Sequence, residues 1–336
     1  MNARERVWAA LRGEPVDRPP ISFWGHFYHR ESSAEQLVEA TLEFHARYGW
    51  DWVKLNPRKH YHVEPWGVTY RYPGVPDVKP VLDQYPIHSG EDWSRIGDVA
   101  HDQGALGEQL EAVRLLRSRL PADVPIIQTV FTPFAILGEM TRTPQDLMLH
   151  LDSHPLAVRQ ALEVVTRVFE RYTHAVIEAG AEGIYLATVD WASRDLMSAE
   201  RYREWSRPGD LRLLAATANA PFNVLHVCKP NNLLPELADY PVAAYSWAAG
   251  ERGNLSLREA LARVPAAVMG GVSHEGPLAG HDADAVSAEL RRAFVETGGR
   301  RWLAAPSCSI SPTTDPLLLA RLRADVESSP TLRTTP

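Results

Sequence analysis

The sequence contains few cysteines, few lysines and no long apolar run. Two cysteines in 336 residues do not make the disulfide framework of a secreted domain. No apolar stretch approaches the roughly 20 residues that cross a bilayer, and residues 1–6 lack the apolar core of a signal peptide. We therefore expect a cytoplasmic protein that does not associate with a membrane.

Basic residues are not clustered either. The formal net charge is −7, and most basic residues are arginines scattered without any Lys/Arg-rich run, which argues against nucleic-acid binding. The apolar fraction of 45% and the charged fraction of 23% are ordinary for a globular protein. A single α/β barrel often reaches this length, so we expect one barrel domain over residues 1–336.

What the chain does have is an alternation of short apolar runs and helical patterns, clearest in its second half. Continuously apolar strands separated by helices are typical of a parallel sheet covered by helices. About eight such pairs favour a (β/α)8 TIM barrel, with N-terminal helices and an irregular insert at residues 56–95. No Gly-x-Gly-x-x-Gly turn supports dinucleotide binding. The expected strands are residues 20–24, 50–55, 124–130, 183–187, 222–228, 242–247, 266–270 and 302–308, and the expected helices include 155–179, 199–218, 233–238, 257–263, 283–297 and one opened by Asp315-Pro316.

The two cysteines and one histidine carry the strongest chemical signal. His226 and Cys228 lie two positions apart at the end of one apolar run, and Cys308 ends another. Residues i and i+2 of a strand share a face, and the strand ends of a barrel meet at one mouth. A His/Cys/Cys set suits zinc, and three protein ligands leave one position open for a substrate. The alternative is that both cysteines are simply small buried hydrophobic residues.

Such a metal would activate thiols. Zinc deprotonates a bound thiol near neutral pH, and the thiolate can attack a methyl group on a cobalamin or another activated donor. Hydrolysis by zinc-bound water is a second possibility, although the sulfur-rich ligand set favours the thiolate role.

Other residues near expected strand ends are weaker candidates. Asp190 is a general acid/base, a residue that supports the groups in direct contact with metal or substrate, or a helix-cap or loop acid. His274 and Glu275 either contact substrate or metal or are ordinary loop residues. Trp24, His26 and Tyr185 are expected to line the substrate pocket, where aromatic rings suit a flat tetrapyrrole but also simply pack cores.

The insert holds a further histidine cluster. His60, His62 and Glu64 alternate along the chain, so they form either a second metal cluster or, with more support, one face of a solvated hairpin.

Over almost its whole length the chain resembles the uroporphyrinogen decarboxylase superfamily, whose fold is a distorted (β/α)8 barrel. The resemblance is carried by residues 4–13 with Asp17-Arg18-Pro19-Pro20 at the start, and by residues 305–312 with Thr314-Asp315-Pro316 at the end. True decarboxylases have an arginine-bearing Met-Arg-Gln-Ala-Gly-Arg segment, which residues 23–30 lack. Their catalytic Asp would fall near Asn56-Pro57-Arg58, where none stands, and Ser307-Cys308-Ser309 replaces their last histidine turn.

The zinc-dependent corrinoid methyltransferases, including methylcobamide:coenzyme M methyltransferases, form the branch that this chain resembles more. Their His-x-Cys and distant Cys match His226, Cys228 and Cys308. In the related cobalamin-independent methionine synthases a Glu would fall near residues 245–247, where this chain has no carboxylate, so the fourth zinc position is open or filled by substrate.

The resemblance implies a zinc-dependent methyltransferase that moves a methyl group between a corrinoid or other activated donor and a small thiol. Because no corrinoid-binding Asp-x-His-x-x-Gly is present, a separate corrinoid protein would present the methyl group. The alternatives are a divergent uroporphyrinogen decarboxylase and a non-catalytic tetrapyrrole or corrinoid binder.

Overall fold

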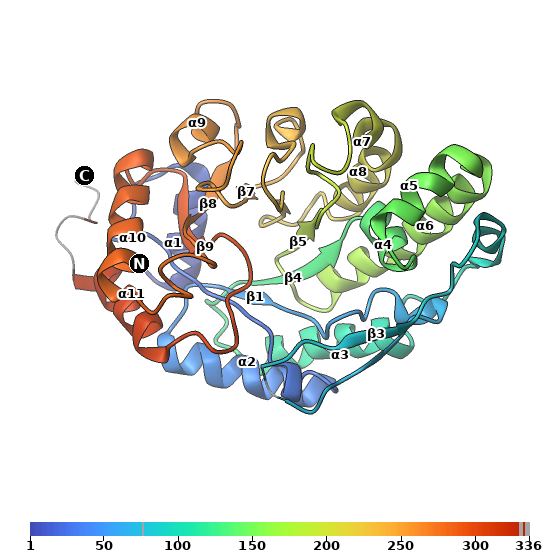
Figure 1. Ribbon diagram of the computed structural model, residues 1–336. Coiled ribbons are helices and arrows are strands. Elements are labelled where there is room, and N and C mark those ends of the chain that lie inside the picture. Colours follow the sequence, from blue (N-terminus) through green and yellow to red (C-terminus); the bar gives the residue numbers. More distant parts are fainter. Residues whose placement is uncertain (76, 329–331, 333–336) are drawn as a thin grey trace.

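The computed structural model describes residues 1–75, 77–328 and 332. Its main sheet has seven parallel strands in the order β1-β4-β5-β6-β7-β8-β9, curled so that helices cover its outer face (Figure 1). The chain is thus a distorted (β/α)8 barrel, as the sequence predicts. The strands are β1 (Val53–Leu55), β4 (Ile126–Phe131), β5 (Gly183–Ala187), β6 (Val224–His226), β7 (Ala244–Ser246), β8 (Ala267–Val272) and β9 (Trp302–Pro306).

Helices follow most of these strands. The α-helices are α1 (Ala3–Arg12), α2 (Ala34–Tyr48), α3 (Gly104–Arg119), α4 (Pro133–Glu139), α5 (Pro144–Ser153), α6 (Pro155–Glu178), α7 (Ala199–Trp205), α8 (Arg207–Ala216), α9 (Leu257–Leu261), α10 (Ala283–Thr297) and α11 (Pro316–Ser328). Short 3-10 helices lie at Tyr28–Arg30, Glu64–Trp66, Gly90–Arg95 and Leu234–Leu237. The part of the chain that the structure describes contains no helix with the length and hydropathy needed to span a bilayer.

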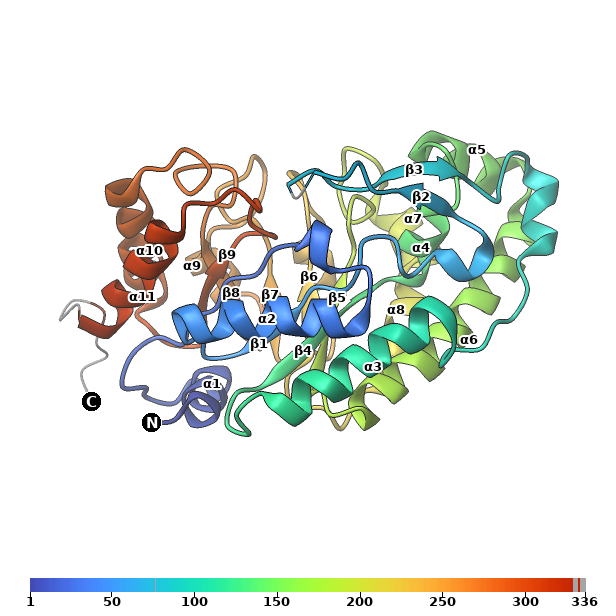
Figure 2. The same ribbon diagram turned by 90° about the horizontal axis from the view of Figure 1, so that it is seen from below.

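The barrel strands are buried on both faces, which explains their continuously apolar sequences. Inside the barrel, side chains from several strands form one apolar cluster, and Val7 of α1 packs against it. Figure 2 shows α1 at one end of the strands and the β2–β3 hairpin, formed by β2 (Thr69–Arg71) and β3 (Val81–Gln84), near the other. The interior is therefore a packed core, closed at the end where the strands begin.

The barrel closes between β9 and β1 through a short extended segment rather than a full strand. Ile21 forms a parallel bridge with Ala304, and its carbonyl accepts a hydrogen bond of 3.0 Å from the Asp51 N–H. The strand predicted at residues 20–24 is therefore reduced to isolated bridges. Pro19 and Pro20 lack the N–H groups that a longer ladder would need.

Two further predictions need correction. The helix expected over residues 199–218 is two helices, α7 and α8, separated at Ser206, and Pro208 stands in the first turn of α8. The insert at residues 56–95 is not wholly irregular, because β2 and β3 pair antiparallel within it. The expected strands and helices elsewhere are confirmed with shifts of a few residues at their ends.

Candidate metal centre

His226 is the last residue of β6 and is held by its neighbours on adjacent strands. Its ring stacks on Tyr185 of β5 with centroids 5.1 Å apart, and its Nδ1 lies 3.2 Å from the Ser246 hydroxyl at the end of β7. The same hydroxyl lies 3.0 Å from the Tyr185 hydroxyl. His226 Nε2 is buried and has no hydrogen-bond partner among the described residues. A buried ring nitrogen without a partner, on a ring fixed through its other nitrogen, is the geometry of a metal ligand.

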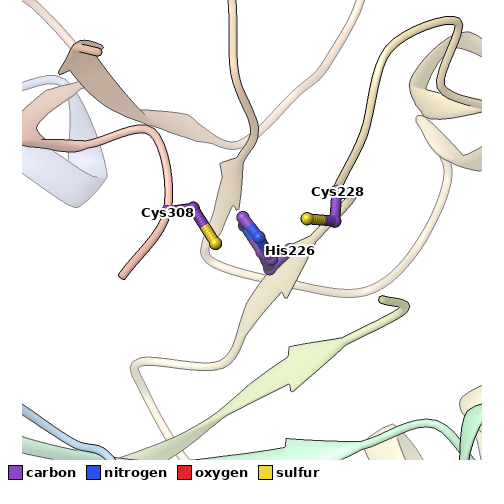
Figure 3. A group of neighbouring side chains, drawn as sticks. All are labelled: His226, Cys228 and Cys308. Carbon is purple, nitrogen blue, oxygen red and sulfur yellow. The ribbon is translucent and has the colours of Figure 1, made fainter. Parts of the chain in front are cut away.

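The two cysteines lie beside that free nitrogen. Cys228 follows β6 and Cys308 follows β9, and both are half-buried free thiols. The ligand atoms of His226, Cys228 and Cys308 all lie within 4.8 Å of one another, and Figure 3 shows the side chains converging on one space. This is the one group of three or more potential ligands that the described residues contain.

The expected placement needs one refinement. β6 ends at His226, so Cys228 is not a strand residue; it lies in the turn before Lys229, whose φ is +73°. Its side chain still turns toward Cys308 (Figure 3). The His-x-Cys spacing therefore works through a strand end and the first residues of a loop.

The neighbouring groups favour a thiolate at this site. The pKa of Cys308 is lowered well below its usual range because the Cys228 thiol donates a hydrogen bond to it and His226 lies close by. The pKa of Cys228 is raised, because it is the donor of that hydrogen bond and is buried. The two thiols together thus hold one proton more readily than two, and binding of a cation would remove that remaining proton.

The donor set fits zinc, which commonly binds cysteine sulfur and histidine nitrogen. With all three ligand atoms within 4.8 Å of one another, small side-chain shifts would bring them to one ion. The orphaned His226 Nε2 gains a partner if an ion binds. No carboxylate stands at the end of β7, where Ser246 holds His226 instead. Three protein ligands would leave one coordination position for a substrate.

The three ligands line a cavity of about 170 Å³ at the mouth of the barrel. Its walls combine aromatic rings and basic or amide side chains. The other lining residues include Trp24, His26, Lys54, Asn56, Arg58, Lys59, Phe131 and Tyr185. The predicted pocket residues Trp24, His26 and Tyr185 thus meet the metal ligands in one space. This volume lies below the range of about 300–1,000 Å³ typical of pockets for drug-sized ligands.

His26 is oriented by a buried carboxylate. Its Nδ1 lies 3.0 Å from Glu31, whose side chain is fully buried, and its ring stacks on Tyr28 at 4.9 Å. A carboxylate on Nδ1 makes Nε2 the proton acceptor of a neutral ring. His26 is therefore suited to take a proton from a molecule in the cavity.

Asp190 lies near the site but not in it. It follows β5 and forms an ion pair of 3.0 Å with Lys229, and its side chain is 44% exposed. The pair joins the loop after β5 to the loop that carries Cys228. The preceding Val189 lines the cavity with φ of +52°, a strained conformation for a β-branched residue.

His274 and Glu275 have different surroundings in the structure, although their side chains lie 3.5 Å apart. His274 Nδ1 lies 2.7 Å from the hydroxyl of Ser307, next to Cys308, and the His274 N–H donates to the same oxygen at 3.0 Å. Glu275 is 74% exposed and contacts only the outer edge of His274, at 3.5 Å. His274 therefore supports the Cys308 loop, and Glu275 does not line the cavity.

The histidine cluster of the insert matches neither expectation. His60 and His62 are buried and lie 2.9 and 3.1 Å from the Glu139 carboxylate, while Glu64 pairs with Arg58 at 3.0 Å. The histidines thus do not form a solvated hairpin face, and with Glu139 they do not form a three-ligand metal group among the described residues. Glu139, far away in the sequence, is the partner that local spacing cannot reveal.

Sequence reasoning missed Lys54 and Glu31. Lys54 is the one charged residue of β1 and lines the cavity, although its side chain is buried. A lysine inside the apolar run of an expected buried strand was the available signal. Glu31 left no such signal, because its burial depends on the fold of the loop before α2.

Comparison with known proteins places this geometry in a family. Residues 2–328 match the family described as Uroporphyrinogen decarboxylase (URO-D). The methylcobamide:CoM methyltransferase MtaA of Methanosarcina barkeri is 25% identical over 328 residues, which cover 93% of this chain and 93% of that protein. A uroporphyrinogen decarboxylase of Alkalilimnicola ehrlichii is 25% identical over 204 residues, 54% of this chain and 55% of its own length.

Among solved structures, a methyltransferase from Methanosarcina mazei has the same fold. It superposes with a TM-score of 0.84 at 24% sequence identity and covers 97% of this chain and 98% of its own. The similarity to MtaA thus spans nearly the whole chain, whereas the similarity to this one decarboxylase covers about half of it.

Proposed function

The chain belongs to the uroporphyrinogen decarboxylase family, and from that premise we propose that it is a zinc-dependent methyltransferase of the branch that acts on thiols. His226, Cys228 and Cys308 hold the ion, and a methyl group passes between a small thiol and a corrinoid or other activated donor. The observation that carries this proposal is the orphaned His226 Nε2, buried beside two thiols at the end of an open cavity. The relatives' names, methylcobamide:CoM methyltransferase, describe the same kind of reaction.

The cavity volume favours a small acceptor. A space of about 170 Å³ lies below the usual range for drug-sized ligands, so it suits a small thiol better than a tetrapyrrole. A corrinoid would therefore offer its methyl group from outside the mouth, which agrees with its delivery by a separate corrinoid protein. A porphyrinogen would have to enter the barrel and displace the walls.

The side chains around the ion have different roles. Zinc at this site would keep a bound thiol as a thiolate near neutral pH, which makes the sulfur nucleophilic. Ser246 fixes His226 so that Nε2 faces the cavity, and Ser307 with His274 supports Cys308. His26, held by Glu31, accepts the proton of the entering thiol. Trp24, Phe131 and Tyr185 exclude water from the sulfur.

An assay of methyl transfer tests the proposal. The purified protein is loaded with zinc, its metal content is measured, and it is incubated with methylcobalamin and small thiols, beside a parallel assay with uroporphyrinogen. We expect thiol methylation that stops when a chelator removes the metal and returns with added zinc. Loss of carboxyl groups from the porphyrinogen would support the decarboxylase alternative instead. Tight binding of methylcobalamin without turnover would indicate a non-catalytic binder.

A further inference from the structure

Lys54 is a buried cation without a carboxylate partner among the described residues. Its residue is 6% exposed, and no carboxylate among the described residues lies within ion-pair distance of its ammonium group. Its hydrogen bond goes to the amide oxygen of Asn56, a neutral acceptor. Burying a charge without a counter-charge costs several kcal/mol as an order of magnitude. A position that retains such a charge therefore needs a compensating interaction.

The surroundings of Lys54 compensate only in part. Its Nζ lies 4.5 Å from the ring centroid of Tyr185 and 5.4 Å from that of Trp24. Cation–π contacts of this kind contribute about 0.5–2 kcal/mol each. Two aromatic faces and one amide oxygen hold the ammonium in place, but they carry no full negative charge. The remaining direction is the cavity, which Lys54 lines together with the three metal ligands.

The charge of the metal site changes when a thiol binds. A zinc ion with two cysteine thiolates and a neutral histidine has no net charge, and one further thiolate makes the site an anion. Lys54 already interacts electrostatically with Cys308, and the Asn56 amide that holds it donates to the Ser309 hydroxyl at 3.2 Å. The ammonium therefore faces the place where the extra negative charge arises.

We propose that Lys54 is the counter-charge for the thiolate that binds at the metal site, so that the pocket binds a thiolate more tightly than its methylated product. This inference rests on the function proposed above. When the sulfur–methyl bond forms, the electron pair of the donor–methyl bond stays on the donor and the sulfur loses its negative charge. The neutral thioether then loses the attraction of Lys54, which favours its release.

The test compares a thiol with its own thioether. Binding of 2-mercaptoethanol and of 2-(methylthio)ethanol to the zinc-loaded protein is measured by calorimetry, because neither ligand has another charge. In Lys54→Met we expect the thiol to bind about 10- to 100-fold more weakly, as for loss of a charge-assisted interaction, while the thioether changes less than about 2-fold. The pH at which thiol binding is half-maximal should also rise. Lys54→Gln, which keeps a polar end near Asn56, should behave in the same way.

Lys59→Met is the matched control. Lys59 lines the same cavity, but its ammonium lies 3.7 Å from the Glu139 carboxylate and so already has a counter-charge. We expect this variant to weaken both ligands by a similar small factor. Equal losses for thiol and thioether in Lys54→Met, at unchanged zinc content, would overturn the inference. If the wild-type protein binds no thiol, the proposed function itself fails, and that outcome is visible before any variant is made.

Discussion

Asp51 and Lys54 are two buried charges three residues apart, and the protein treats them in opposite ways. Asp51, just before β1, is 2% exposed and contacts Arg6 and Arg18 at 2.6 Å each and Arg323 at 3.4 Å. It also accepts the Ile21 N–H at 2.9 Å, beside the segment that closes the barrel. Lys54 has no carboxylate partner among the described residues; it donates a hydrogen bond to the Asn56 amide and interacts electrostatically with Cys308. At the end of the barrel where the strands begin, arginines thus balance the buried charge of Asp51. At the mouth, the Lys54 ammonium and His226 Nε2 are available to a ligand.

The largest expected effect is on stability, and it comes from removing the buried charge of Asp51. Asp51→Asn should lower the free energy of unfolding by about 3–5 kcal/mol, because it removes the counter-charge of Arg18 and one of the two counter-charges of Arg6 and of Arg323. Urea unfolding measures this, and zinc bound per folded chain should not change. Asp17→Asn is the control: Asp17 also pairs with Arg6, but it is 43% exposed, so we expect about 1 kcal/mol or less. Equal losses in the two variants would mean that burial does not distinguish them.

The next largest effect is on zinc binding at the mouth of the barrel. Cys308→Ser should reduce zinc affinity by more than about 100-fold, since a hydroxyl is a much poorer ligand than a thiolate and replacing a neighbour of a ligand alone costs about 10–100-fold. Competition with a chelating dye measures the affinity. The unfolding free energy of the metal-free protein should stay within about 1 kcal/mol of wild type. Unchanged zinc binding in this variant would remove Cys308 from the metal site.

Lys54→Met should stabilise the metal-free protein, in contrast to Asp51→Asn. Burial lowers the pKa of Lys54 to about 7, from 10.5, so below pH 7 the folded state holds an unfavourable charge that the unfolded state tolerates. We expect a gain of about 1–3 kcal/mol at pH 6. Because wild type loses this penalty as the pH rises from 7 toward 10, the gain should shrink over that range. A gain that is independent of pH would point to packing instead of charge.

The smallest effect concerns Asp190. Asp190→Asn removes a partly exposed ion pair with Lys229, so stability should fall by less than about 1 kcal/mol and zinc affinity by less than about 3-fold. Methyl transfer to a thiol should keep most of its rate. A rate loss of about 100-fold or more would instead make Asp190 the general acid or base that its position in the sequence suggested.

The grouping of His226, Cys228 and Cys308 was the most predictable feature of the candidate site. Cysteine is so rare here that a His-x-Cys pair and one distant Cys, each at the end of an apolar run, reduced the candidates to three residues. Parallel strands of a barrel then bring their ends together whatever lies between them. The apolar runs likewise predicted most strands, because a strand buried on both faces has no alternation to obscure it.

The misses depend on partners that are remote in the chain. His60 and His62 are buried because Glu139 reaches them, and His26 is oriented because Glu31 folds back under it. Local spacing contains neither contact. Residues 20–24 have strand composition, but two prolines limit their pairing, and the closing hydrogen bonds involve Asp51 and Ala304. Whether a charged residue such as Lys54 is paired can be decided only after every neighbouring element has been placed.

The three proposed metal ligands come from two strand ends that are three strands apart in the sheet, and one of these strands borders the closure at Ile21. His226 and Cys228 belong to the β6 side and Cys308 follows β9, which borders the closing segment. An ion bound by both loops would link them at the mouth of the barrel and would limit how far the strand ends can separate. We expect removal of the ion to cause faster hydrogen exchange first in residues 20–22 and 302–306, which are far in sequence from His226 and Cys228. The same ion would then serve in catalysis and hold the strand ends together.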